Sequence, residues 1–122
     1  MTQTAPQTEH VDFSESQDVR EFENGKLEML KIGGADVGLL TVHPGWRWSN
    51  GVKPIAGTEW CEAPHFAYMI SGSLHIKMKD GSEFDLTPGM VYTLPSGHDA
   101  WVNGEEDVVT VDWQGASTYA KR

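Results

Sequence analysis

The stretch Pro64-His65-Phe66-Ala67-Tyr68-Met69-Ile70-Ser71-Gly72 reads as a short β-strand that opens with a histidine and closes at a glycine turn. A second stretch, Pro88-Gly89-Met90-Val91-Tyr92-Thr93-Leu94-Pro95-Ser96-Gly97-His98, places a strand between two turns and delivers another histidine. Proline and glycine mark turns because proline fixes φ and glycine readily adopts left-handed backbone. The two stretches predict two short strands, each with a histidine at one end.

The rest of the chain adds strands of similar length. Leu74-His75-Ile76-Lys77-Met78 alternates apolar and polar residues and runs into Asp80-Gly81, which is a strong signal for a two-residue hairpin turn. Asn103-Gly104 reads as another tight turn between strands, and Val11 to Gly25 is expected to be irregular or an edge strand. Other strands are expected at residues 26–32, 37–42, 83–86, 91–94, 100–102 and 108–113. Short strands at intervals of about 8–12 residues predict an all-β sandwich or barrel.

Length and composition favour one β-rich domain. A chain of 122 residues is long enough for a single hydrophobic core, and its 13 Gly and 6 Pro suggest many turns. Residues 1–10 are rich in Thr, Gln and Glu and are expected to form a flexible tail. Residues 11–122 are expected to form the single domain.

Charge and cysteine content narrow the classes of partner and compartment. The formal net charge is −9, which argues against binding to nucleic-acid phosphates and to anionic membrane surfaces. No apolar run is long enough to span a bilayer, and the N-terminus lacks the pattern of a signal peptide. The single cysteine, Cys61, excludes an intrachain disulfide and fits a reducing compartment. We therefore expect a cytoplasmic protein.

The two histidine-bearing stretches resemble the two motifs of the cupin superfamily. The first motif runs glycine, five residues, His-x-His, three or four residues, glutamate, six residues and glycine. With Gly72 as the closing glycine, His65 stands at the glutamate position, and Cys61 and Glu59 stand at the two histidine positions. Three potential ligands are thus retained while the identity of each is changed.

The second cupin motif runs glycine, five residues, Pro-x-Gly, two residues and histidine. Gly89, Pro95 and Gly97 stand at the required spacing, but Ala100 occupies the histidine position. His98 lies two residues earlier, so it shares a strand face with Ala100 and can still point into the barrel.

The resemblance covers roughly residues 26–119 and is closest to small single-domain bacterial cupin proteins (cupin 2-like) with no assigned general activity. It implies a jelly-roll β-barrel or sandwich of two antiparallel sheets. It also implies a homodimer, because cupins of this size commonly associate through edge strands.

The changed motif residues still offer metal-ligand chemistry. Glu59, Cys61 and His65 have equal parity and share one face if the segment is extended, although Pro64 interrupts a strand there. Together with His98 they are candidate ligands for a divalent transition metal (Zn, Fe, Mn or Ni), and a thiolate biases such a site toward zinc or ferrous iron. His65 and His98 are also the candidate catalytic acid–base residues.

Tryptophans are numerous for a chain of this size. Trp46, Trp48 and Trp101 are candidate lining residues of a pocket for a small-molecule ligand. The alternative is that these side chains only supply mass to the core and to a dimer interface.

Three functions remain open at this point. The first is a metal-dependent enzyme acting on a small organic molecule, with dioxygenase, isomerase, cyclase and dehydratase chemistry unresolved. The second is a non-catalytic binding or sensory module, which the departures from the cupin motifs favour. The third is metal-free acid–base catalysis by His65 or His98.

Overall fold

Alternating burial along the strands sets the architecture. In β5 (Ser73–Met78) the side chains of Leu74 and Ile76 are buried, whereas their neighbours are only partly covered. In β4 (His65–Ser71) Ala67 and Met69 are fully buried, and the alternating residues Phe66, Tyr68 and Ile70 are exposed. Successive side chains of a strand point to opposite faces, so each strand offers one apolar face to a common core. This pattern makes a sandwich of two sheets.

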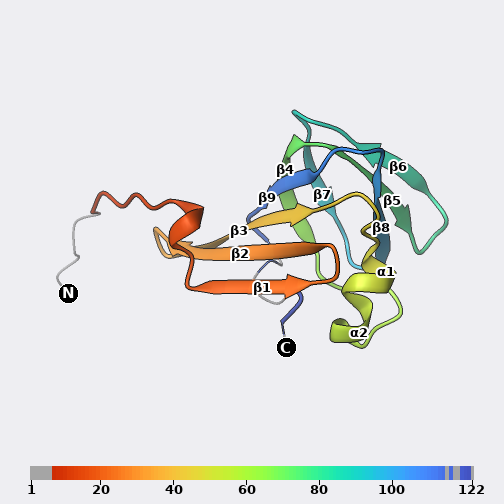
Figure 1. The fold of residues 1–122 in the computed structure, drawn as a ribbon, viewed down its shortest axis with the longest axis horizontal. Helices are drawn as coiled ribbons and strands as arrows, with labels where there is room; N and C mark the ends of the chain where they lie inside the picture. The colour runs from red at the N-terminus through yellow and green to blue at the C-terminus, as the bar shows by residue number, and fades with distance from the viewer. Residues whose placement is uncertain (1–6, 115, 117–118, 122) are drawn as a thin grey trace.

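In the computed structural model, which describes residues 7–114, 116 and 119–121, the strands form two antiparallel sheets (Figure 1). The six-stranded sheet contains, in spatial order, β1 (Asp18–Phe22), β2 (Gly25–Ile32), β3 (Ala35–Val42), β9 (Val108–Asp112), β4 and β7 (Val91–Leu94). The three-stranded sheet has the order β6 (Glu83–Leu86), β5 and β8 (His98–Asn103). The expected all-β class with two antiparallel sheets is confirmed.

The chain changes sheets at Gly72, between β4 and β5. Its φ of 76° lies in the left-handed region, which glycine adopts without steric cost. A Cβ placed on Gly72 would lie 2.8 Å from the Cα of Val108, so a larger residue would collide with the backbone next to β9. The glycine that closes the first motif is therefore required both by its φ and by this close approach.

The hairpin predicted at Asp80-Gly81 joins β5 to β6, and the amide of Gly81 donates to the carbonyl of Met78 at 2.9 Å. The turn expected at Asn103-Gly104 lies between two strands, β8 and β9. It leaves β8 in the three-stranded sheet and leads to β9 in the six-stranded sheet, so it joins the two layers.

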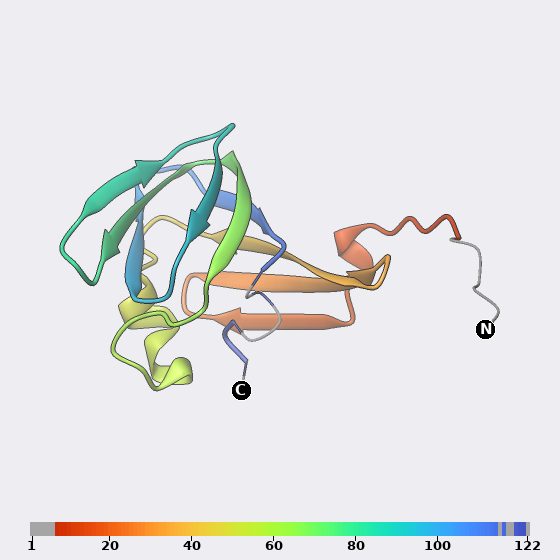
Figure 2. The same cartoon turned by 180° about the vertical axis from the view of Figure 1, so that it is seen from behind.

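The N-terminal part contains both of the alternatives expected for Val11 to Gly25. A short 3-10 turn, η1 (Phe13–Glu15), is capped by Asp12, whose carboxylate accepts from the amide of Ser14. β1 then forms the edge of the six-stranded sheet. Residues 7–12 carry no helix or strand and extend away from the sheets (Figure 2), while residues 1–6 of the expected tail lie outside the described residues.

The long loop expected after Pro44-Gly45 contains two short helical turns, α1 (Trp48–Gly51) and α2 (Lys53–Ala56). They lie at one end of the sandwich (Figures 1 and 2), where Trp48 and Val52 are buried. Gly57 ends α2 in the left-handed conformation. No helix among the described residues is long and apolar enough to cross a membrane.

Candidate functional site

A cavity of about 40 Å³ lies between the two sheets. Most of its wall is apolar, and polar groups enter it from strands β4, β7, β8 and β9 and from the C-terminal segment. The polar lining residues are His65, Tyr92, His98, Thr110, Asp112 and Tyr119. An apolar wall with a few convergent polar groups is typical of a small-molecule site.

His65 and His98 line this cavity, and Cys61, which lines a second and more open hollow, lies beside the two imidazoles. One ligand atom from each residue lies within 4.8 Å of the other two, and Cys61 Sγ is 3.9 Å from His65 Nε2. His65 begins β4 and His98 begins β8, so two strand ends deliver the imidazoles. A backbone bridge brings in Cys61, because its amide donates to the His98 carbonyl at 2.8 Å.

Hydrogen bonds fix both imidazole rings. Nδ1 of His65 donates to the carboxylate of Asp112, and Nδ1 of His98 lies 3.0 Å from the carbonyl of Pro95, to which it donates. With each Nδ1 occupied, Nε2 of each ring is left for the site. Metal-binding histidines in proteins usually have this second hydrogen bond, which fixes the tautomer and orients the ring.

The same contacts shift two pKa values. Burial disfavours the charged form of His65, but the hydrogen bonds to Asp112 and Cys61 outweigh it and raise the pKa of His65 to about 9. Burial likewise disfavours the Cys61 thiolate, but the hydrogen bonds to His65 and His98 outweigh it and lower the pKa of Cys61 to about 7. Both shifts favour an ionised thiolate beside an imidazolium in the metal-free pair.

Asp112 was not singled out in the sequence. It is 6% exposed, and its Oδ1 also accepts from the amide of Gln114 at 2.9 Å. The signal for it was present in the alternation of β9, where Thr110 and Asp112 are polar residues on the buried face. A buried carboxylate needs a charged or hydrogen-bonding partner, and for Asp112 this partner is His65.

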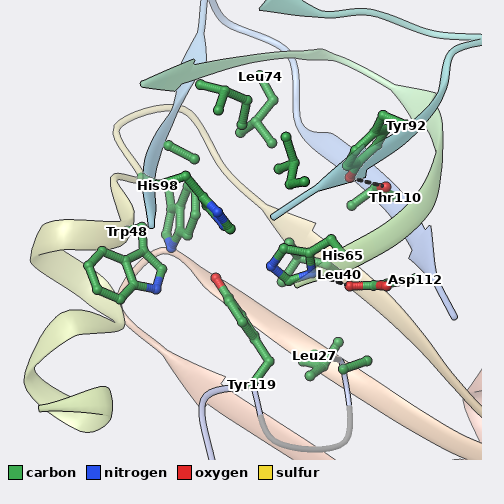
Figure 3. A pocket seen from close by; sticks show the side chains of 15 residues that line it. Leu27, Leu40, Trp48, His65, Leu74, Tyr92, His98, Thr110, Asp112 and Tyr119 are labelled. Carbon is green, nitrogen blue, oxygen red and sulfur yellow. Dashed lines mark hydrogen bonds and ion pairs between the residues drawn. The ribbon is translucent and has the colours of Figure 1, made fainter. Parts of the chain in front are cut away.

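Tyr92, Thr110 and Tyr119 were also missed. The Tyr92 hydroxyl donates to Thr110 Oγ1 at 2.8 Å, and Thr110 Oγ1 donates to the carbonyl of Tyr68 at 3.0 Å. Tyr119 comes from the C-terminal segment, and its ring meets that of His65 edge-on at 5.7 Å between centroids. Figure 3 shows its hydroxyl directed toward the space beside His65 and His98.

The structure does not bring Glu59 to the group, which corrects the expectation that it would be a ligand. Glu59 is exposed, beyond the end of α2 at Gly57, and lies in a shallow surface hollow with Lys53 and Ser49. The segment before Pro64 is not an extended strand, so equal parity does not place Glu59 and Cys61 on one face.

The three tryptophans divide between the cavity and the surface. Trp46 and Trp48 line the cavity, and both are buried. Trp101 does not, which corrects its expected place in the pocket. It stacks on His75 at 4.6 Å between centroids, with the Arg47 guanidinium 4.3 Å from its ring. The cause is alternation along β8, because His98 and Ala100 line the cavity and Trp101 faces the other way.

The donor set suits a transition-metal ion. Two ligands about 2.0–2.3 Å from one ion at a tetrahedral angle lie about 3.5 Å apart, close to the 3.9 Å between Cys61 Sγ and His65 Nε2. One thiolate and two imidazoles leave a tetrahedral ion one open position, as in catalytic zinc sites. Cys61, His65 and His98 therefore fit the group that the sequence suggested.

No protein-family model and no curated protein matches this sequence. Solved structures do match the fold. The polyketide cyclase RemF from Streptomyces resistomycificus is similar, with a TM-score of 0.63 and 15% identity over 90% of this chain and 80% of that one. An Acinetobacter protein of unknown function gives a TM-score of 0.56 and 14% identity over 80% of this chain and 90% of that one.

A formate complex of oxalate decarboxylase from Lactobacillus farciminis gives a TM-score of 0.59 and 17% identity over 84% of this chain. The match covers 32% of the decarboxylase, so this chain spans about a third of that protein's length. The likenesses confirm the cupin fold that the two motifs predicted.

Proposed function

We propose that the protein is a metal-dependent enzyme that acts on a small organic molecule. The observation that carries the proposal is the convergence of Cys61 Sγ with the imidazoles of His65 and His98, the two histidines that line the apolar cavity. The likeness to a decarboxylase and a cyclase supports a catalytic use of this fold. Among dioxygenase, isomerase, cyclase and dehydratase chemistry, the donor set favours none.

Each ligand has a defined role in this proposal. A bound divalent ion supplies a Lewis acid that polarises a substrate oxygen or lowers the pKa of a bound water. Cys61 would bind as the thiolate, which favours zinc or ferrous iron over magnesium or calcium. His65 binds through Nε2 after losing its proton, while Asp112 holds Nδ1 and fixes the ring. His98 binds through Nε2, with Nδ1 held by the Pro95 carbonyl.

The test is the metal content of protein purified without an affinity tag, measured by inductively coupled plasma mass spectrometry. We expect near-stoichiometric metal in the parent protein and loss of it in His98→Ala and Cys61→Ser. Glu59→Gln and His43→Ala are matched controls, because Glu59 is exposed and His43 pairs with Asp107 away from the site. Both controls should retain the metal.

Two outcomes contradict the proposal. One is parent protein that stays metal-free after reconstitution with zinc or ferrous iron. The other is equal metal content in His98→Ala, Cys61→Ser and the two controls, which would place the ion elsewhere. Circular dichroism of each variant separates loss of metal from loss of fold.

A second candidate is metal-free acid–base catalysis, and the contact between Asp112 and His65 favours it. A buried carboxylate on Nδ1 orients an imidazole so that Nε2 can exchange a proton with a substrate. In that case turnover survives chelation and is lost in His65→Phe. A non-catalytic binding module, in contrast, takes up a small molecule without metal and without turnover.

A further inference from the structure

Two buried donors lack a hydrogen-bond partner within the described part of the chain. They are the indole nitrogens of Trp46 and Trp48, whose side chains are 3% and 2% exposed. Buried polar groups in native proteins are nearly always hydrogen-bonded, so an unpaired donor beside a cavity indicates a missing acceptor. The two nitrogens have different surroundings.

Trp46 Nε1 faces the backbone of α1. It lies 3.2 Å from the position that a Cβ on Gly51 would take, so main-chain atoms stand in front of it. Trp48 lines both the cavity and a second, more open hollow of about 300 Å³ that also touches Cys61 and Tyr119. Figure 3 shows the indole nitrogen of Trp48 on the side of its ring that faces Tyr119.

The Tyr119 hydroxyl is a second donor at the same place. No described residue forms a hydrogen bond with it, and the residue is 7% exposed. Arg20 of β1 holds the backbone of this segment by donating to the carbonyls of Ala116 and Tyr119 at 3.1 and 2.8 Å. Burial raises the pKa of Tyr119 well above its usual value, so the hydroxyl keeps its proton as a donor.

We propose that Trp48 Nε1 and the Tyr119 hydroxyl bind one oxygen of the substrate, which is a small carbonyl or carboxylate compound. Two neutral donors with no acceptor between them among the described residues match the lone pairs of one such oxygen. This inference rests on the proposed function. An oxygen bound there lies next to Cys61, His65 and His98, and it takes part in catalysis only if these residues form the active site. The apolar remainder of the cavity suits a short hydrocarbon body rather than a polyol or a cation.

The probes are acetate and acetone, which carry the same oxygen acceptor with and without charge. Each is titrated into ¹⁵N-labelled protein, both metal-free and zinc-loaded, while the five indole N–H resonances are followed by NMR. We expect the Trp48 resonance to move downfield on saturation, since its N–H gains an acceptor. The resonance of Trp101, which lies outside the cavity, is the internal control.

Variants that delete one donor each sharpen the test. Trp48→Phe and Tyr119→Phe should bind the effective probe about fivefold to tenfold more weakly, as expected for one lost hydrogen bond. Trp101→Phe should bind it as the parent does. A response to acetate alone assigns a carboxylate, and a response to acetone alone assigns a neutral carbonyl.

The inference is overturned if neither probe shifts the indole N–H resonance of Trp48 in the parent protein. This measurement needs no variant. It is also overturned if Trp48→Phe and Trp101→Phe bind the probe equally. These results are separate from the metal assay. Protein that binds zinc but shows no Trp48 response loses only this inference, and metal-free protein that shows the response loses only the metal-dependent function.

Discussion

The carboxylate of Asp112 accepts a hydrogen bond from Nδ1 of His65, although the two residues stand 47 positions apart in the chain. They meet because β4 and β9 are antiparallel neighbours, with Ala67 of β4 opposite Asp112. The pairing turns a strand-end histidine into an oriented ligand with a negative charge behind it. It also couples the proposed metal site to the central strands of the six-stranded sheet.

Replacing Asp112 should weaken metal binding. Asp112→Asn removes the negative charge that holds Nδ1 of His65, and changing the hydrogen-bond partner of a metal-binding histidine costs about 10–100-fold in metal affinity. Competition with a chromogenic chelator measures the affinity for zinc. Asp107→Asn is the matched control, since it breaks the corresponding contact to the exposed His43. Equal affinities in the two variants would remove Asp112 from the site.

The Cys61 thiol should ionise near pH 7 in metal-free protein. Its pKa is lowered from 9.0 to about 7, so the thiolate persists from high pH down to that value and is lost below it. Thiolate absorbance in the ultraviolet, recorded against pH after chelation, gives the midpoint. In His65→Phe the imidazole contact is gone while burial remains, so the midpoint should rise. A midpoint near 9 in the parent protein would contradict the contact between Cys61 and His65.

Substitution of Gly72 should destabilise the fold more than substitution of a glycine with the same backbone angle in open space. Gly72 and Gly34 both have a φ of 76°, but no atom lies within 4 Å of a Cβ on Gly34. Gly34→Ala should cost about 1–2 kcal/mol for the left-handed conformation. Gly72→Ala should add about 1–3 kcal/mol for the collision next to Val108. Urea unfolding of both variants measures the difference, and equal costs would rule out the collision.

Features that depend on local spacing, such as strand positions and inward-facing residues, could be predicted from the sequence. Turn residues and alternation predicted most strand positions, and the equal parity of His98 and Ala100 predicted that both would face inward. Cys61 was found through its motif position, yet it enters the group through a backbone bridge to His98 rather than along a strand. The homodimer and the cytoplasmic location stay predictions.

The residues that contact His65 from distant parts of the chain could not be predicted from local sequence patterns. Asp112 and Tyr119 reach His65 only through the pairing of β9 with β4 and the return of the C-terminal segment across the cavity. Strand order of this kind is set by the whole core rather than by any one stretch. The prediction for Glu59 was wrong because equal parity was assumed from Glu59 across Pro64 to His65, where the backbone is not a strand.

The most direct test of the metal site is X-ray absorption at the zinc edge on zinc-loaded protein. We expect one sulfur at about 2.3 Å and two imidazole nitrogens at about 2.0–2.1 Å from the zinc, with the sulfur lost in Cys61→Ser. A first shell made only of oxygen and nitrogen in the parent protein would contradict this expectation, because Cys61 would then stand outside the site.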